Sequence, residues 1–190
     1  MKHIKLASAA AITLGLAIAG SASAQTQLAG SIQFAGSVTD TTCIVQGGDG
    51  TNKASTNFKV TLQPATVDDL AAAGDTANPT EFSVILGGPG SGACAVGTVA
   101  SFAFDPNSQL LDKTTGRLNN GPANGAKNVQ VQLLDGGSTG SPIDLNSYSV
   151  DFPALVNNQA EIKFGAEYYA TAQTEAGQVL TDVLYVVNYN

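Results

Sequence analysis

The chain has 190 residues, of which 15 are acidic and 8 are basic, and its formal net charge at pH 7 is −7. A single domain fits this length and can bury a core without several disulfides. The acidic balance argues against nucleic-acid binding and against docking on anionic lipid, because both need a basic surface that neutralises phosphate groups.

The first 24 residues predict a signal peptide. Lys2 and Lys5 form a basic start, a short apolar run follows at residues 12–18, and Ala22-Ser23-Ala24 matches a cleavage site of small residues. The alternative is an uncleaved anchor, but the apolar run is too short and too rich in alanine and glycine for a membrane span. We therefore expect an exported, acidic mature chain from residue 25 onward, without membrane insertion.

The next segment, QTQLAGSIQFAGSVTDTTC (residues 25–43), predicts an amphipathic strand. Leu28, Gly30, Ile32 and Phe34 share one face of an extended chain, because strand side chains alternate with period two. A glycine weakens a strand and packs nothing, so its presence on the apolar face indicates a close approach of another backbone.

The chain contains two cysteines, Cys43 and Cys94. After a signal peptide, one disulfide formed in an oxidising compartment is the expected state, and two free thiols are the alternative. A zinc site is disfavoured, because two thiolates do not complete a zinc shell and the one histidine, His3, leaves with the signal peptide.

Between the termini, short runs of valine, threonine, isoleucine, phenylalanine and tyrosine alternate with turn residues. Strands are predicted at residues 31–45, 58–63, 81–87, 99–104, 128–134, 159–171 and 179–189. One helix is predicted in VDDLAAAG (residues 67–74), with Thr66 as its cap and Gly74 at its end. About seven short strands at this spacing predict an all-β protein, an antiparallel β-sandwich.

Catalytic groups are not predicted. Without a histidine, the mature chain cannot assemble a Ser–His–Asp or Cys–His arrangement. The glycine-rich stretches GGDG and GGPGSG lack the following Lys-Ser or Lys-Thr of a phosphate loop, and turns explain them better. We predict no enzyme, no cofactor and no metal site.

The final run, VLTDVLYVVNYN (residues 179–190), is apolar on both faces. One face carries Val183, Tyr185, Val187 and Tyr189, and the other carries Leu180, Leu184 and Val186. Such a strand belongs inside a sheet with a neighbour on each edge, and only Asp182 adds the charge that usually protects an exposed edge. The N-terminal strand of the same molecule is one candidate neighbour.

Several segments, in order along nearly the whole mature chain, resemble subunits of chaperone–usher pili, the type 1 fimbrial major pilins. They are GSIQFAGSVTDTTC, FKVTLQPATVDDL, FSVILGGPGSGAC, NVQVQLLDGGSTGSPIDL, EIKFGAEYYAT and VLYVVNYN, with a penultimate tyrosine at Tyr189. The resemblance implies an incomplete immunoglobulin-like sandwich that lacks its last strand. It also implies an N-terminal donor-strand extension at residues 25–35 ahead of a pilin domain at residues 36–190.

In such pilins a periplasmic chaperone lends the missing strand, and the next subunit's extension replaces it at the outer-membrane usher. The resemblance implies that Leu28, Ile32 and Phe34 fill pockets of a neighbouring subunit and that Gly30 lies where the groove narrows. The acceptor groove would be flanked by the last strand, with Val183, Tyr185, Val187 and Tyr189, and on its other side by the first strand.

The expected function is therefore a structural subunit that is exported through the periplasm to the cell surface. There it polymerises with further pilin subunits into the shaft of a fimbrium and supports adhesion and biofilm formation. A minor or adaptor pilin is one alternative. A self-contained secreted β-sandwich that binds a ligand or carbohydrate is the other. A pilin and a self-contained domain differ in whether residues 25–34 remain free or fold back on their own domain.

Overall fold

The computed structural model describes residues 43–49, 56–88, 94 and 100–189. The predicted signal peptide and the predicted donor segment, with Leu28, Gly30, Ile32 and Phe34, lie outside the described residues.

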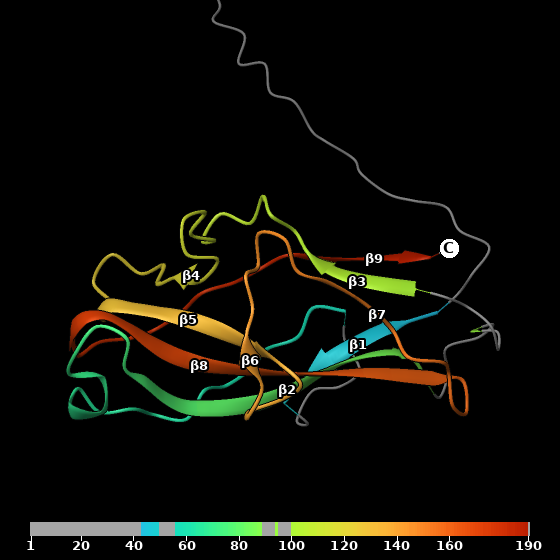
Figure 1. Ribbon diagram of the computed structural model, residues 1–190, viewed down its shortest axis with the longest axis horizontal. Helices are drawn as coiled ribbons and strands as arrows, with labels where there is room; N and C mark the ends of the chain where they lie inside the picture. The colour runs from blue at the N-terminus through green and yellow to red at the C-terminus, as the bar shows by residue number, and fades with distance from the viewer. Residues whose placement is uncertain (1–42, 50–55, 89–93, 95–99, 190) are drawn as a thin grey trace, which may run out of the picture. The chain divides into compact units, whose positions relative to one another are not determined.

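The described chain forms two β-sheets (Figure 1). The larger sheet has the strand order β1 (Val45–Gly48), β2 (Thr76–Gly87), β8 (Gln159–Glu175), β5 (Lys127–Asp135) and β4 (Leu118–Asn119), and β6 (Ser141–Pro142) also pairs with β5. The smaller sheet has the order β7 (Ser149–Asp151), β3 (Ala100–Phe104) and β9 (Tyr185–Tyr189). Every pairing between these strands is antiparallel, which confirms the predicted all-β antiparallel architecture.

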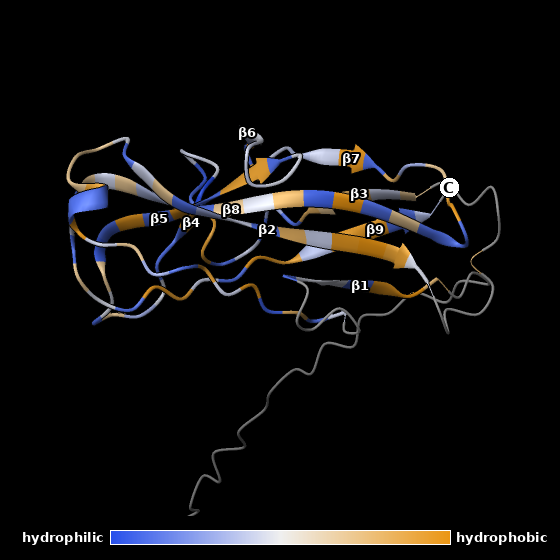
Figure 2. Ribbon diagram, turned by 90° about the horizontal axis from the view of Figure 1, so that it is seen from below, coloured by the Kyte–Doolittle hydropathy of each residue, from blue (hydrophilic) through white to orange (hydrophobic). Residues whose placement is uncertain are grey.

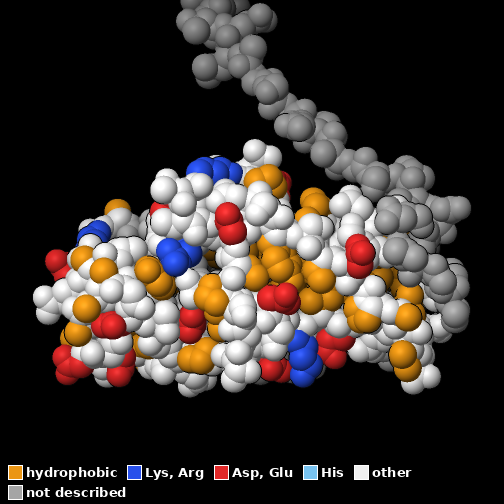
Figure 3. All heavy atoms as spheres, in the orientation of Figure 1, with side chains coloured by type: hydrophobic (Ala, Val, Ile, Leu, Met, Phe, Trp, Pro, Cys, Tyr) orange, Lys and Arg blue, Asp and Glu red, His pale blue; other side chains and the backbone are white. Residues whose placement is uncertain are grey.

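The core lies between the two sheets and is rich in aromatic rings. Phe102 of β3 is fully buried, and its ring lies 5.0 Å from that of Phe104, 5.4 Å from that of Phe164 and 5.4 Å from that of Tyr185. The alternating pattern ASFAF places Phe102 and Phe104 on the inner face of β3, while Ser101 and Ala103 point outward. On the face drawn in Figure 3, hydrophobic side chains gather in the band between β3 and β9 above and β8 and β2 below.

The long pair β2–β8 shows why these residues form strands. Phe82 lies opposite Phe164 in the register, and their rings stack at 5.4 Å inside the core. On the outer face, Glu81 forms an exposed ion pair with Lys163 at 3.2 Å. Apolar residues inside and charged residues outside match the pattern of an antiparallel sheet with one solvated face.

The predicted helix at residues 67–74 is wrong in length, because only one 3₁₀ turn forms, at Asp68–Leu70. The predicted cap is also wrong, because Val67 rather than Thr66 is the N-cap residue. The Thr66 hydroxyl, one residue earlier, accepts a hydrogen bond from the Asp69 backbone N–H at 3.3 Å. The Asp75 carboxylate then accepts the Ala72 N–H at 2.7 Å, which competes with continuation of the helix. A segment this short cannot offset the cost of helix nucleation. No helix in the described part of the chain is long and apolar enough to cross a bilayer.

Several strand predictions also differ from the structure. β1 begins at Val45, where the predicted strand at residues 31–45 ends, and β2 begins at Thr76 rather than at residue 81. Residues 58–63 form no ladder with any described strand, and the C-terminal strand begins at Tyr185 rather than at Val179. Before β8, Asn157 and Asn158 both have positive φ, 53° and 61°, between the bridged residues Val156 and Gln159. This is the conformation of a tight hairpin turn.

Candidate functional site

Two neighbouring segments of the sandwich present strand edges that no described strand covers. β9 pairs with β3 through one edge, from Ala100 opposite Tyr189 to Phe104 opposite Tyr185, and nothing described pairs with its other edge. Residues 58–63 alternate in exposure as a strand does, yet they join neither sheet. We call the side of the sandwich bounded by residues 58–63 and residues 179–189 the open side.

The hydrophobic core reaches the surface at the open side. The inward-facing side chains of both bounding segments pack on the core but are only half-buried. They are Phe58, Val60 and Leu62 from one segment and Val179, Val183, Tyr185, Val187 and Tyr189 from the other. A completed sandwich would cover such a row, so the core lacks a cover along this line.

The structure thus brings together the four predicted acceptor residues of the C-terminal run. It also adds Phe58, Val60 and Leu62, for which the sequence predicts a strand but no site. The alternation in FKVTLQ was the available signal. What the pattern lacks is any sign that this strand would have no partner.

Figure 2, which views the molecule from below, shows β7, β3 and β9 of the small sheet following one another, and β1, drawn below β9 in this view, belongs to the large sheet. Hydrogen-bonded neighbours in a sheet are about 4.8 Å apart. Two strands that leave room for one missing strand between them are therefore about 10 Å apart. Backbone groups cannot bridge that distance, but a tyrosine side chain can.

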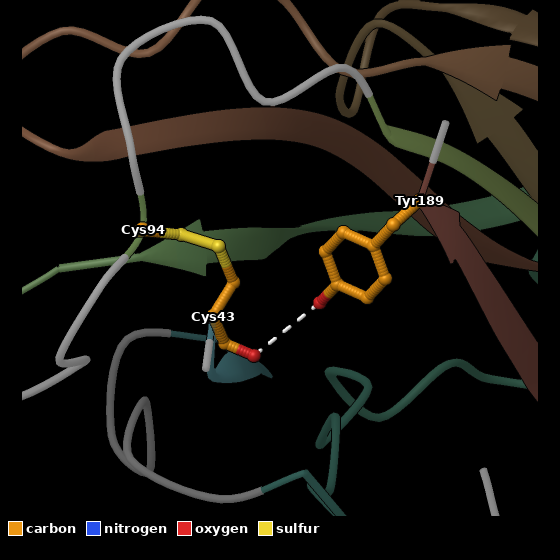
Figure 4. The surroundings of a disulfide bond; sticks show 3 residues. All are labelled: Cys43, Cys94 and Tyr189. Carbon is orange, nitrogen blue, oxygen red and sulfur yellow. Dashed lines mark hydrogen bonds between the residues drawn. A yellow bond between two sulfur atoms is a disulfide. The ribbon is translucent and has the colours of Figure 1, made fainter. Parts of the chain in front are cut away.

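Two tyrosines of β9 make such bridges. The Tyr185 hydroxyl donates to the Thr56 carbonyl at 2.6 Å, and its ring lies 6.0 Å from that of Phe58. The Tyr189 hydroxyl donates to the Cys43 carbonyl at 3.3 Å (Figure 4). Each end of β9 is therefore tied by a side chain to the N-terminal part of the described chain.

Burial raises the pKa of both hydroxyls, and the charge that Tyr189 would carry raises that of Tyr185 further. Loss of the proton would remove the donor and leave a phenolate in a partly apolar setting. Both groups therefore remain neutral donors at physiological pH.

The disulfide prediction is confirmed, because Cys43 and Cys94 are bonded with their Cα atoms 4.7 Å apart. Cys94 is buried in the core, and Cys43 stands just before β1. The bond fixes the backbone whose carbonyl receives the Tyr189 hydroxyl (Figure 4). The cysteine pair thus supports one end of the open side.

At the other end, the open side leads into an apolar pocket of about 480 Å³. Leu62 from one bounding segment and Val179 from the other both line it. Its remaining apolar lining includes Ala65, Val67, Leu70, Ala126, Val129 and Tyr168. Thr66, Thr174 and Glu175 also line it, so the pocket offers polar groups beside its apolar surface.

Asn120 holds the chain next to this pocket. Its amide nitrogen donates to the carbonyls of Ala126 and Gln178 at 3.0 and 2.9 Å, and its amide oxygen accepts the Leu180 N–H at 2.9 Å. Gly121 adds a backbone bond to the Leu180 carbonyl at 2.9 Å. These bonds position Val179, although residues 178–180 belong to no strand.

Gly47 of β1 makes room for Phe58 in the other bounding segment, residues 58–63. The Phe58 ring lies where a side chain at Gly47 of β1 would project, so only glycine leaves room for it. The sequence gives Gly47 as part of a turn cluster, and its close contact with a distant phenylalanine was not predictable from that position.

The arrangement suits the capture of an extended peptide. Unpaired edges offer main-chain hydrogen bonds, and a row of half-buried apolar groups ending in a pocket offers places for alternate side chains. In the described ranges, no group of three or more His, Cys, Asp or Glu residues is gathered to hold a metal ion.

Comparison with known proteins gives consistent results. The model of a protein family described as "Fimbrial protein" matches residues 32–190. The chain is 34% identical to the F17 fimbrial protein of Escherichia coli over 180 residues, which cover 93% of this chain and 96% of that protein. It is 36% identical to the major fimbrial subunit SMF-1 of Stenotrophomonas maltophilia over 171 residues, covering 85% and 92% of the two chains.

The fold is also similar to that of a chain in a solved chaperone–usher pilus. The TM-score is 0.55 at 16% identity, and the match covers 86% of this chain and 97% of that chain. At this identity the similarity supports the immunoglobulin-like pilin fold and nothing finer.

Proposed function

Because this chain belongs to the fimbrial protein family, we propose that it is a structural, non-enzymatic subunit that assembles into a chaperone–usher pilus by accepting a strand from another subunit. The observation that carries the proposal is the open side, where two uncovered edges flank a row of half-buried core side chains. Strand addition would complete the sandwich there.

The donor in this proposal is the N-terminal extension of the neighbouring subunit. Its residues Leu28, Ile32 and Phe34 would pack on the apolar row, and each contributes about 1.5–3 kcal/mol when buried. The ladder of about ten main-chain hydrogen bonds would add about 1 kcal/mol each. Such a joint is strong without a covalent bond.

The proposal includes the path of the subunit. Residues 1–24 direct export, a periplasmic chaperone occupies the open side first, and the outer-membrane usher exchanges it for residues 25–35 of the next subunit. Residues 36–190 form the pilin domain of a surface fimbrium that supports adhesion and biofilm formation.

Gly30 marks the narrowest part of the contact in this proposal. We expect Gly30→Leu to block polymerisation while export to the periplasm continues, because a side chain there would meet the acceptor backbone. Immunoblots of periplasmic and surface fractions measure both. Gly36 is the first residue after the extension and has the same period-two position as Gly30, so Gly36→Leu is the matched variant. Normal pili with Gly30→Leu would contradict the role given to Gly30.

The central experiment compares two forms of the chain. The shortened form lacks residues 1–34. The self-complemented form is the shortened form with residues 25–38 fused to its C-terminus through a flexible linker. We expect only the self-complemented form to be soluble, monomeric and markedly more heat-resistant, as measured by calorimetry and size-exclusion chromatography.

A shortened form that is already stable and monomeric would contradict the proposal. It would mean that the sandwich is complete without a donor, and a self-contained secreted ligand-binding domain would then be the better description.

A further inference from the structure

Two glutamines of β5 share the outer face of the large sheet, but only one of them has both ends of its amide paired. Gln130 and Gln132 are two residues apart and are 5% and 4% exposed. The Gln132 amide oxygen accepts the Arg117 Nε–H at 2.7 Å, and its nitrogen donates to Glu167 at 2.8 Å. The hydrogen bonding of Gln132 is therefore complete within the protein.

Gln130 uses only its amide nitrogen. This nitrogen donates to the Asp112 carboxylate at 2.9 Å and to the Asn119 side-chain oxygen at 2.9 Å. Because a carboxylate only accepts, the nitrogen must face Asp112 and the oxygen, Oε1, must face elsewhere. Oε1 is buried and accepts no hydrogen bond from the described residues. Buried amide oxygens are nearly always paired, so the site calls for a donor from outside the described chain.

Gln130 lines a polar pocket of about 270 Å³ together with Thr171 of β8. Both side chains lie on the outer face of the sheet, because Gln130 pairs with Tyr169 and Thr171 is two residues further along β8. The pocket is far larger than one water molecule, whose share of liquid volume is about 30 Å³. It is thus large enough for a small polar ligand.

The pocket offers hydrogen-bond donors and acceptors side by side. Asn119 turns its oxygen to Gln130 and keeps its amide nitrogen as a donor. Asn128 donates its nitrogen to the Gln173 carbonyl at 2.8 Å and keeps its oxygen as an acceptor. The exposed Thr171 hydroxyl can do both. The other lining residues are Asn120, Pro122, Ala126, Lys127 and Val129.

This lining selects the chemistry of the ligand. None of the lining residues is acidic and one is the cation Lys127, which disfavours a metal ion. An inorganic anion would bring only acceptors to the oxygens of Gln130 and Asn128. A sugar ring carries several hydroxyl groups, each of which both donates and accepts, and it can pair with every polar group of the pocket.

We propose that this pocket binds one hexopyranose unit of a neutral carbohydrate, with a ligand hydroxyl donating to Gln130 Oε1. Asn119, Thr171 and Asn128 hold further hydroxyls of the same ring. The site lies on the large sheet, away from the edge of β9, so it goes beyond strand addition and does not depend on it.

The test uses the full chain purified after export and the methyl glycosides of glucose, galactose, mannose and N-acetylglucosamine. Saturation-transfer difference NMR measures binding of each glycoside, with glycerol as the reference polyol. Two variants each remove one pairing group: Thr171→Val removes the hydroxyl, and Asn119→Asp removes the donor while keeping the oxygen that Gln130 needs. Thr76→Val is the matched control, since Thr76 is exposed and lies opposite Tyr169 in the same sheet without lining the pocket.

We expect at least one glycoside to bind and both variants to weaken it about three- to tenfold, the effect of one hydrogen bond, while Thr76→Val binds as the original chain does. A lack of signal from all four glycosides would overturn the inference, because water alone would then fill the pocket. Unchanged binding in both variants would also overturn it, as would equal weakening by Thr76→Val. The assembly of pili reports separately on the proposed function and has no bearing on this result.

Discussion

Tyr185 and Tyr189 show how single side chains can connect two segments that no backbone hydrogen bond joins. Each hydroxyl reaches a carbonyl of the N-terminal segment, Thr56 in one case and Cys43 in the other. The sequence placed both tyrosines on one face of the final strand, but it could not give their partners. Those carbonyls lie more than a hundred residues earlier, and any residue type supplies a carbonyl.

Replacing Tyr189 by phenylalanine should remove one hydrogen bond and keep the ring in place. We expect Tyr189→Phe to lower the free energy of unfolding of the self-complemented form by about 0.5–1.5 kcal/mol, as is usual for one such bond. Urea titration followed by circular dichroism measures this. Tyr169→Phe is the control, since the Tyr169 ring lies under the Arg117 guanidinium on the large sheet, and an equal loss there would contradict a specific role for the Tyr189 bridge.

The raised pKa values of Tyr185 and Tyr189 predict alkaline destabilisation. Below about pH 10, the ordinary tyrosine pKa, the hydroxyls are protonated in both the folded and the unfolded chain. Above it the unfolded chain loses protons first, so stability falls as the pH rises toward the folded-state pKa values. Melting temperatures of the self-complemented form between pH 9 and 11.5 should therefore fall less steeply in Tyr185→Phe combined with Tyr189→Phe, and an unchanged slope would count against this.

Among the elements, the alternation of apolar residues predicted most strands but not their pairing. Phe82, Val84 and Leu86 are correctly expected in a strand, and the turn at Asn157 and Asn158 follows from local chemistry. Residues 58–63 have the same alternation and yet lack a ladder, because pairing depends on a neighbour that the pattern does not contain. The short strands β4, β6 and β7 escaped prediction because two or three residues carry no periodicity.

The same limit applied to the candidate site. The inward faces of residues 179–189 were predictable from the sequence, whereas the start of β9 was not. Residues before Tyr185 bond to loops instead of to a strand: the Leu184 N–H donates to the Ser108 hydroxyl at 3.0 Å, and Leu180 is held by Asn120. Side-chain amides and hydroxyls in loops compete for backbone groups in ways that period-two patterns do not register.

Asn120 offers a test of that support. We expect Asn120→Ala to destabilise the self-complemented form by about 1–3 kcal/mol, because the Gln178 and Ala126 carbonyls and the Leu180 N–H all lose a partner. Thermal unfolding measures the change. Asn124→Ala, at an exposed position in the same loop, should have little effect, and similar losses in both variants would show that the loop, not the Asn120 amide, matters.

For the molecule as a whole, the disulfide closes a long loop between Cys43 and Cys94, which are 51 residues apart. In the chain-entropy model such a bond stabilises by about 4 kcal/mol. Cys43→Ser should therefore lower both the melting temperature of the self-complemented form and the periplasmic yield of the subunit. Treatment of the self-complemented form with a reductant should reproduce the lower melting temperature. An unchanged value in both experiments would contradict a structural role for the bond.

In the described chain, β9 is an outer strand of the small sheet, paired with β3 at one edge and uncovered at the other, and β7 is the outer strand on the opposite side. In the proposed function only the uncovered edge of β9 accepts a donor. A subunit with a single acceptor and, as proposed, a single donor has a valency of two, with unlike ends. Chains built from it cannot branch, and they have a polarity: an empty acceptor at one terminus and an unused donor at the other. The two ends therefore stop growing in different ways. A subunit without a donor extension ends the polymer where a donor would otherwise be offered, and a subunit without an open side ends it where an acceptor would otherwise be offered.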